Sequence, residues 1–188
     1  MGTLTNMIRS VCVFCASSDS VAELYRQTAY DLGQRLACEG VALVYGGASI
    51  GLMGCVARGV HAEGGKVIGV LPDFFIGKGI DYLEVDELII TKDIRERKAV
   101  MDLRSEAFMA LPGGIGTLEE AVEILSLVQL RQTAKPMILI NTLDFYHELL
   151  SLLEKMVRLK FAKPDTMKIF HLAKDPADAI LILRSLQG

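Results

Sequence analysis

The segment 112–117 holds the residues best suited to bind a phosphate group. It has the sequence Pro-Gly-Gly-Ile-Gly-Thr and runs directly from an apolar, strand-like segment into a helical pattern. Glycines let the backbone approach a ligand closely, and the first turn of a helix presents unpaired N–H groups at the positive end of its dipole. Thr117 adds a hydroxyl donor. A tight turn without a ligand is the simpler interpretation, but a second glycine-rich turn at Gly46 and Gly47 favours a bound phosphate.

Two groups of charged residues could do chemistry beside such a turn. Glu120 follows Thr117 by three residues, so it either closes a capping box with Thr117 or places a carboxylate next to the bound group. The segment 93–98, Asp-Ile-Arg-Glu-Arg-Lys, opens another helical pattern immediately after a strand-like run. Basic residues at the front of a helix oppose its dipole. Arg97 and Lys98 therefore belong either to a solvated face or to a site for an anionic ligand, and these residue types alone favour neither.

Other kinds of site find little support. The chain has neither the G-x-G-x-x-G motif nor the Walker lysine motif, so NAD binding and NTP hydrolysis of those types are not indicated. Cys12 and Cys15 form a C-x-x-C, but on a strand they would point to opposite faces, which favours two buried thiols over a redox or metal pair. The histidines lack metal-ligand spacing, so no metal site is predicted.

The elements that must position these residues alternate along the chain. Short runs rich in Val and Ile predict strands at 11–15, 41–45, 66–70, 87–91, 107–111, 136–140 and, more weakly, 168–172. Helical patterns lie between them at 20–39, 50–63, 93–105, 117–131, 143–158 and 175–186. This order predicts an α/β, Rossmann-like three-layer sandwich with a mainly parallel sheet of about seven strands and helices on both faces.

Four local signals refine this prediction. Ser20 with Glu23, and Thr117 with Glu120, fit capping boxes at helix starts. Asp175 before Pro176 fits an N-cap, and Gly40 fits a helix stop. Because ligands of open parallel sheets bind outside the carboxyl ends of the strands, the turns after the strands are the expected site. The irregular stretch 71–86 is a candidate mobile loop over it.

The composition suits one globular domain spanning residues 1–188. Of the 188 residues, 51% are apolar and 23% charged, which is enough for a sizeable core. The formal net charge of −3 and the lack of a basic run argue against a nucleic-acid partner. No apolar run is long enough to span a membrane, and the N-terminus does not resemble a signal peptide. We therefore expect a cytoplasmic protein with no membrane partner.

The glycine segment also carries a family resemblance. Residues 112–120, Pro-Gly-Gly-Ile-Gly-Thr-Leu-Glu-Glu, resemble the P-G-G-x-G-T-x-x-E signature of the LOG family, the cytokinin riboside 5′-monophosphate phosphoribohydrolases. Further similar segments are 13–18, 44–54, 96–98, 129–130 and 135–136, so that the resemblance covers roughly residues 10 to 165. It implies hydrolysis of the N-glycosidic bond of a nucleoside 5′-monophosphate, either AMP or a cytokinin riboside monophosphate. The products are the free base and ribose 5-phosphate.

The resemblance also implies roles for individual residues. Arg97 and Glu120 would be the catalytic pair. Positions implied to bind the substrate and its phosphate are Ser17, Gly46, Gly47, Met53, Lys98, Gly113, Gly114, Ile115, Gly116, Thr117 and Ser126. The family resemblance implies a homodimer that needs no metal and no organic cofactor. Ile115 and Leu127 replace aromatic residues that are frequent in the family, and these replacements favour plain AMP over a prenylated adenine nucleotide.

Two other functions fit parts of the pattern. Molybdenum-cofactor carrier proteins resemble this chain in the glycine turns but less in the Arg–Glu pair, so a non-catalytic carrier of a nucleotide or phosphate cofactor is the alternative. The family is also labelled "possible lysine decarboxylase". That activity would require pyridoxal phosphate and a Schiff-base lysine, and no lysine here stands out for the role.

Overall fold

A computed structural model describes residues 7–79, 82 and 84–187. Seven strands form one sheet in the order β4-β3-β2-β1-β5-β6-β7, and every neighbouring pair is parallel. The strands are β1 Ser10–Phe14, β2 Ala42–Tyr45, β3 Val67–Pro72, β4 Glu87–Thr91, β5 Ala107–Ala110, β6 Met137–Ile140 and β7 His171–Ala173. The predicted α/β fold class is confirmed.

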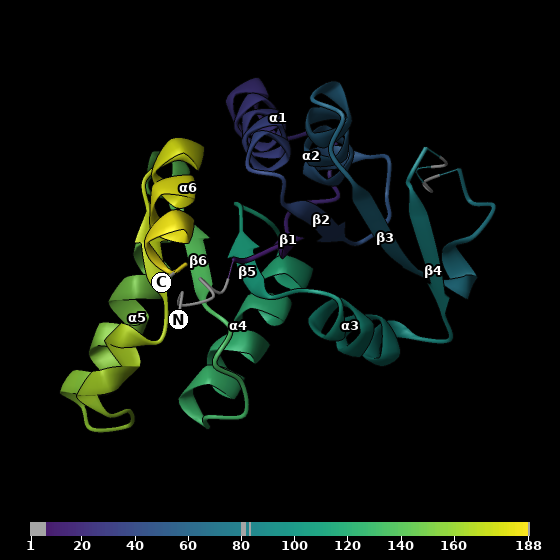
Figure 1. Ribbon diagram of the computed structural model, residues 1–188. Coiled ribbons are helices and arrows are strands. Elements are labelled where there is room, and N and C mark those ends of the chain that lie inside the picture. Colours follow the sequence, from purple (N-terminus) through teal and green to yellow (C-terminus); the bar gives the residue numbers. More distant parts are fainter. Residues whose placement is uncertain (1–6, 80–81, 83, 188) are drawn as a thin grey trace, which may run out of the picture.

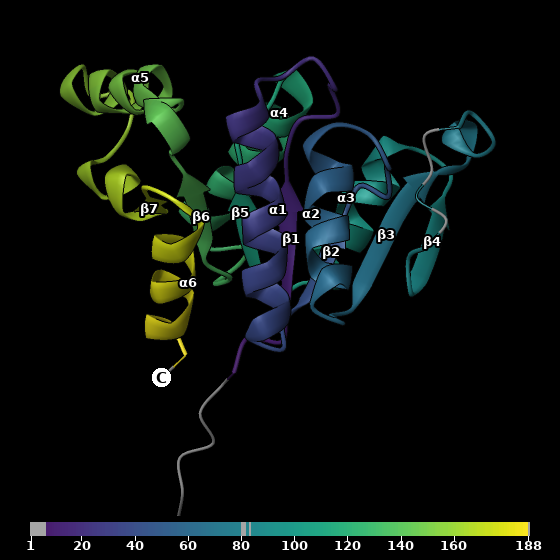
Figure 2. The ribbon, with the colours of Figure 1, turned by 90° about the horizontal axis from the view of Figure 1, so that it is seen from above.

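Six α-helices cover the two faces of this sheet (Figures 1 and 2). Helices α1, α2 and α6 lie on one face, and α3, α4 and α5 on the other. Their bounds are α1 Glu23–Cys38, α2 Gly51–Ala62, α3 Ile94–Leu103, α4 Ile115–Gln129, α5 His147–Arg158 and α6 Pro176–Ser185. Short 3-10 turns occupy Asp73–Phe75, Thr142–Asp144 and Pro164–Lys168. No helix in the described ranges is long and apolar enough to cross a membrane.

The alternation of side chains along β1 divides the core into two layers. Val11 and Val13 pack into the cluster under α1, α2 and α6, whereas Cys12 and Phe14 pack into the cluster under α3 and α4. Successive residues of a strand point to opposite faces, and both faces of this sheet are covered, so both sets are apolar. Cys15 joins the first cluster, which confirms that the two thiols of the C-x-x-C are buried on opposite faces and unpaired.

Chain order creates a crevice beside β1. From β1 the chain adds β2, β3 and β4 in one direction, and then returns to place β5 against the other edge of β1. This reversal is a topological switch point, where the loops that leave β1 and β5 diverge and leave room for a ligand. The turn that follows β5 is the glycine segment 112–117. The fold therefore brings that segment to the binding edge of the sheet.

Two predicted capping boxes are wrong. Ser20 does not cap α1, because it lies in a turn before the helix and the N-cap is Ala22, which makes no side-chain capping bond. Thr117 does not cap α4 either, because the helix begins two residues earlier, with Gly114 at the N-cap. The Asp175 cap is confirmed, since its carboxylate accepts a hydrogen bond from the Asp178 N–H at 2.8 Å. Gly40 ends α1 as predicted, with a φ of +69°.

Further differences from the prediction concern β7, α5 and the loop at 71–86. The last strand is β7 at His171–Ala173 rather than 168–172, because Pro164–Lys168 forms a 3-10 turn that extends into the predicted range. Helix α5 begins at His147, since the residues before it form a separate turn in which Leu143 has a φ of +52°. Of the predicted loop 71–86, Leu71 and Pro72 belong to β3. Residues 80, 81 and 83 lie outside the described residues.

Candidate active site

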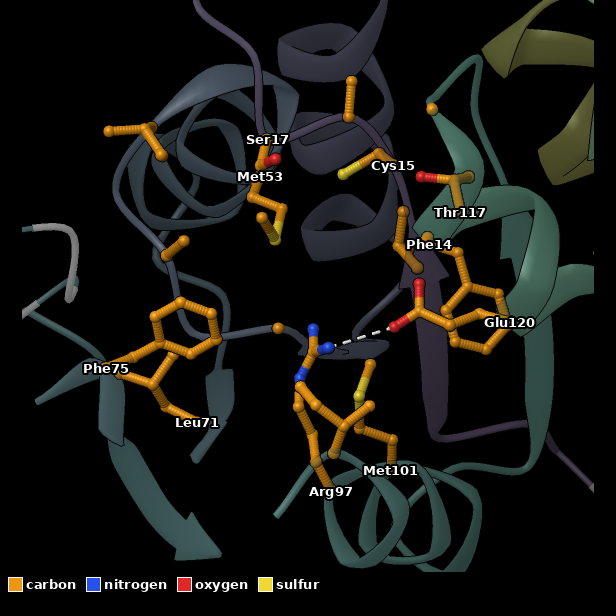
Figure 3. Close-up of a pocket in the computed structure, with 18 of the residues that line it drawn as sticks. Phe14, Cys15, Ser17, Met53, Leu71, Phe75, Arg97, Met101, Thr117 and Glu120 are labelled. Carbon is orange, nitrogen blue, oxygen red and sulfur yellow. Dashed lines mark hydrogen bonds and ion pairs between the residues drawn. The ribbon is translucent and has the colours of Figure 1, made fainter. Parts of the chain in front are cut away.

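A cavity of about 440 Å³ opens at the carboxyl ends of β1, β2, β3 and β5 (Figure 3). This volume lies in the range of small-molecule sites, about 300–1,000 Å³. Its walls come from the turns after these strands and from the first turns of α2, α3 and α4. The residues that line it are Val13, Phe14, Cys15, Ala16, Ser17, Gly46, Ala48, Ile50, Met53, Leu71, Phe75, Ile94, Arg97, Met101, Gly114, Ile115, Gly116, Thr117 and Glu120.

An ion pair lies in this cavity. Arg97 Nη1, from the first turn of α3, is 3.1 Å from Glu120 Oε1 on α4, and the two side chains are only 14% and 11% exposed. Arg97 Nε also donates to the carbonyl oxygen of Val70 at 3.1 Å, so β3 holds the guanidinium in place. Figure 3 shows both charged ends pointing into the cavity. The tertiary structure thus joins two residues that are 23 positions apart in the sequence.

Gly46 makes room for the guanidinium. A Cβ atom at this position would lie 2.0 Å from Arg97 Nη2 and 2.8 Å from the Met53 sulfur. Real Cβ atoms do not approach so closely, so any side chain at this position would push Arg97 aside. The glycine in the turn after β2 therefore has a steric role in the placement of Arg97.

Burial raises the pKa of the Glu120 carboxyl above its ordinary value. Desolvation disfavours the ionised form, and this effect outweighs the opposing attraction of Arg97, which acts to lower the pKa. The result is a carboxylate that is a stronger base than one on the surface, held next to a fixed cation. Perturbed carboxyls of this kind in cavities are typical of functional sites.

The glycine segment 112–117 forms the part of the cavity wall at the start of α4. Gly114 and Gly116 line it, and apart from adjacent residues and the backbone of α4, no described atom lies within 4 Å of the position that a Cβ would take at either residue. No side chain caps the N-terminus of α4, so its first N–H groups stay available to a ligand. A Cβ at Gly113 would lie 2.1 Å from the Thr117 hydroxyl oxygen, which explains why Thr117 can pack inward with 5% exposure.

The predicted site residues fall into two groups. The cavity brings together Ser17, Gly46, Met53, Arg97, Gly114, Ile115, Gly116, Thr117 and Glu120. The other four lie outside its lining. Gly113 lies behind Thr117. Gly47 is not part of the lining, and its carbonyl accepts a hydrogen bond from the Tyr82 N–H at 3.0 Å. Lys98 Nζ is bound to Glu119 at 2.5 Å and Glu123 at 2.6 Å, and Ser126 is exposed farther along α4.

Sequence reasoning missed much of the apolar lining. Ile94 and Met101 lie on the same face of α3 as Arg97. Their spacing of three and four residues from Arg97 could have placed them in the cavity wall. Leu71 lies near the carboxyl end of β3, where the strand-end rule applies. Phe75 follows three residues after that strand in a 3-10 turn, and no motif marked it. No group of three or more His, Cys, Asp or Glu residues in the described ranges forms a metal-binding cluster.

Comparisons with known proteins identify the family of this chain. The family model described as "possible lysine decarboxylase" matches residues 53–183. A probable cytokinin riboside 5′-monophosphate phosphoribohydrolase of Oryza sativa subsp. japonica is 45% identical over 174 residues, which cover 93% of this chain and 77% of the relative. A cytokinin riboside 5′-monophosphate phosphoribohydrolase of Arabidopsis thaliana is 41% identical over 180 residues, covering 96% and 79%.

Solved structures share the fold at lower identity. The molybdenum cofactor binding protein of Rippkaea orientalis has a TM-score of 0.71 and 27% identity, covering 95% of this chain and 96% of that one. The molybdenum cofactor carrier protein of Chlamydomonas reinhardtii has the same TM-score and identity, covering 95% and 97%. The match of the family model and the identity above 40% to curated relatives, over most of both chains, decide the assignment. The chain belongs to the LOG family of cytokinin riboside 5′-monophosphate phosphoribohydrolases, whose family model carries the description "possible lysine decarboxylase".

Proposed function

We propose that this protein hydrolyses the N-glycosidic bond of a nucleoside 5′-monophosphate, either AMP or a cytokinin riboside monophosphate, and releases the free base and ribose 5-phosphate. The observation that carries the proposal is the buried Arg97–Glu120 pair, 3.1 Å apart, in the same cavity as the uncapped N-terminus of α4. A phosphate site and a perturbed carboxyl in one cavity are what this reaction requires. The names of the curated relatives support the same activity.

The 5′-phosphate would bind at the start of α4. The backbone N–H groups of Gly114 and Gly116 and the hydroxyl of Thr117 would contact it, helped by the positive end of the helix dipole. Gly113 contributes indirectly, because its lack of a side chain lets Thr117 pack inward. Binding energy from the phosphate, which does not react, would hold the ribose so that its anomeric carbon stays close to Glu120.

Glu120 would act at the reacting carbon. Cleavage of the C1′–N bond leaves its electron pair on the base, which takes up a proton from solvent, and the sugar passes through an oxocarbenium-like state that a neighbouring carboxylate stabilises. Water then adds to C1′ and loses a proton, for which a carboxylate of raised pKa is a suitable acceptor. Arg97 would keep Glu120 in place and donate hydrogen bonds to the ribose or phosphate oxygens. No step assigned here needs a metal or an organic cofactor.

Product analysis tests this proposal directly. The purified protein is incubated with AMP and, separately, with isopentenyladenosine monophosphate, and the products are separated by chromatography. We expect equal amounts of free base and ribose 5-phosphate, with the preferred substrate identified by the ratio of kcat/KM values. Tight nucleotide binding without release of base from either compound would instead favour the carrier function. The 27% identity to the molybdenum cofactor proteins makes that function the second candidate.

We also propose a homodimer. Ile115 and Val122 on α4 and Leu152 on α5 are 82%, 44% and 48% exposed, and α5 has no buried residue although one of its faces is apolar. A second copy of the chain would cover this surface.

Sedimentation should give the mass of a dimer, and Leu152→Glu should shift the measured mass toward that of the monomer. Leu181→Glu, at a 59% exposed position of α6 on the other face, is the matched control. A monomeric mass for the unaltered protein contradicts the proposal.

The cysteines favour a reducing compartment. All four are free, three are buried, and Cys38 is an exposed thiol. Disulfides are common in secreted proteins and rare in the cytosol, so these thiols support a cytoplasmic location. The acidic net charge of −3 fits a small-molecule substrate better than a nucleic-acid or membrane partner.

A further inference from the structure

Phe75 forms a wall of the cavity that the proposed mechanism does not use. Figure 3 shows its ring beside Leu71, across the cavity from Thr117 and Glu120, with Arg97 between the two sides. A nucleotide whose phosphate binds at the start of α4, and whose anomeric carbon lies at Glu120, must extend its base away from α4. The far wall, with Phe75 and Leu71, is where that base arrives.

The Phe75 ring is not needed for the core. It belongs to neither of the two buried apolar clusters and remains half-buried at the cavity. The ring nevertheless has defined neighbours: its centroid lies 4.4 Å from that of Phe74, and Lys78 Nζ lies 5.7 Å from both centroids. Cation–π contacts of this kind hold aromatic rings in place. An ordered aromatic ring that faces a cavity rather than the core is suited to contact a ligand.

In the part of the chain that the structure describes, the far wall at Phe75 and Leu71 has no polar side chain that could identify a base by its hydrogen-bonding edge. Among the described residues, the lining has polar or charged side chains only at Ser17, Arg97, Thr117 and Glu120. Thr117 and Glu120 lie on the α4 side, and Ser17 lies beside Met53. Arg97 lies between the two sides; it donates to Glu120 and to the Val70 carbonyl, and in the proposed function its other donors serve the ribose or phosphate. The wall opposite α4 offers aromatic and aliphatic surface, which recognises the flat face of a base.

We infer that Phe75 is a specificity-determining residue that stacks on the base of the nucleotide, so that the site selects its base by stacking and shape rather than by hydrogen bonds to the Watson–Crick edge. The inference rests on the proposed function. Every base has a flat face, and stacking strength grows with its area, so purine nucleotides should be preferred to pyrimidine nucleotides. A purine whose Watson–Crick edge is blocked should still be a substrate.

The test uses 1,N6-ethenoadenosine monophosphate, in which N1 and N6 of adenine are closed into a ring, beside AMP and CMP. For the unaltered protein we expect kcat/KM for the etheno compound within about tenfold of that for AMP, with CMP the poorest of the three. Phe75→Ala should lower kcat/KM for both purine nucleotides by about 5- to 100-fold, which corresponds to the usual strength of stacking between a base and an aromatic side chain. The loss for CMP should be smaller.

Matched variants separate stacking from simple space filling. Phe75→Leu keeps an apolar side chain without a flat ring and should restore little, whereas Phe75→Tyr should restore most of the activity. Ile76→Ala shortens the apolar side chain of the next residue, which is 40% exposed and does not line the cavity, and should stay within about twofold of the unaltered protein. Inhibition by ribose 5-phosphate, which has no base, should have the same inhibition constant in the unaltered and Phe75→Ala proteins.

Two results would overturn the inference. One is a Phe75→Ala protein that hydrolyses AMP and the etheno compound as well as the unaltered protein does. The other is an equal weakening of ribose 5-phosphate inhibition, which would mean that the ring supports the site as a whole. If the unaltered protein releases no base at all, the proposed function fails instead, and calorimetric binding of AMP to the unaltered and Phe75→Ala proteins still tests the stacking.

Discussion

Glu120→Ala should remove nearly all release of base from a nucleoside monophosphate, with kcat lowered by a factor on the order of 10² to 10⁴. The carboxylate is the only acidic side chain among the described residues that line the cavity. No neighbouring acid can therefore replace it at the anomeric carbon. The proposed phosphate site lies at the start of α4 and does not depend on this side chain, so KM should change far less than kcat. Initial rates of base release over a range of AMP concentrations measure both quantities.

Two further variants make the result specific to Glu120. Glu120→Gln keeps the size of the side chain and an oxygen that can accept from Arg97, so it should be equally inactive yet keep its thermal stability. Glu123→Ala removes a carboxylate one turn farther along the same helix that is 42% exposed and pairs with Lys98, and it should retain activity. Turnover by Glu120→Ala within about tenfold of the unaltered protein would exclude this residue from general acid–base catalysis.

Arg97→Ala should lower kcat/KM by a factor on the order of 10² and move the acidic limb of the pH profile to higher pH. Burial raises the pKa of Glu120, and Arg97 is the largest influence that opposes this rise. Without the guanidinium the pKa of Glu120 rises further. The carboxylate is then ionised only at higher pH, so activity that needs it is lost at a higher pH as the solution is acidified. The measurement is kcat/KM for AMP as a function of pH.

Gly46→Ala tests the Arg97–Glu120 pair without removing either charge. Its Cβ would displace the flexible guanidinium end of Arg97, so activity should fall while the melting temperature changes little. Arg95→Ala, two residues before Arg97 on α3 and exposed, is the control and should behave like the unaltered protein.

For Arg97→Ala, an acidic limb that stays in place would show that Glu120 is not the group that titrates.

The local pattern of the sequence determined the order of the elements and most of the proposed phosphate site. Apolar runs between helical patterns were enough to predict seven strands, since a parallel sheet covered on both faces needs strands that are apolar throughout. The turn at residues 112–117 was recognisable because its glycines lead directly from a strand into a helix, where unpaired backbone N–H groups can bind a phosphate. Helix starts were harder: Ser20 and Thr117 have the residue types of caps, but where the helices begin is decided by packing against the sheet.

Only the tertiary structure decided what lies opposite the glycine turn. Arg97 is separated from Glu120 by β5 and a loop, and residue types alone did not distinguish a solvated basic face from a site. The crossing of the chain from β4 to β5 brings the two within 3.1 Å. The same crossing leaves Lys98, the next residue, outside the cavity and paired with Glu119 and Glu123 of α4, because neighbours on a helix point about 100° apart. Phe75 has no local signature, since its place in the cavity depends on where the turn after β3 lies relative to α4. Sequence specifies such residues only through the whole fold, because contacts between distant segments are set by how the sheet and helices pack.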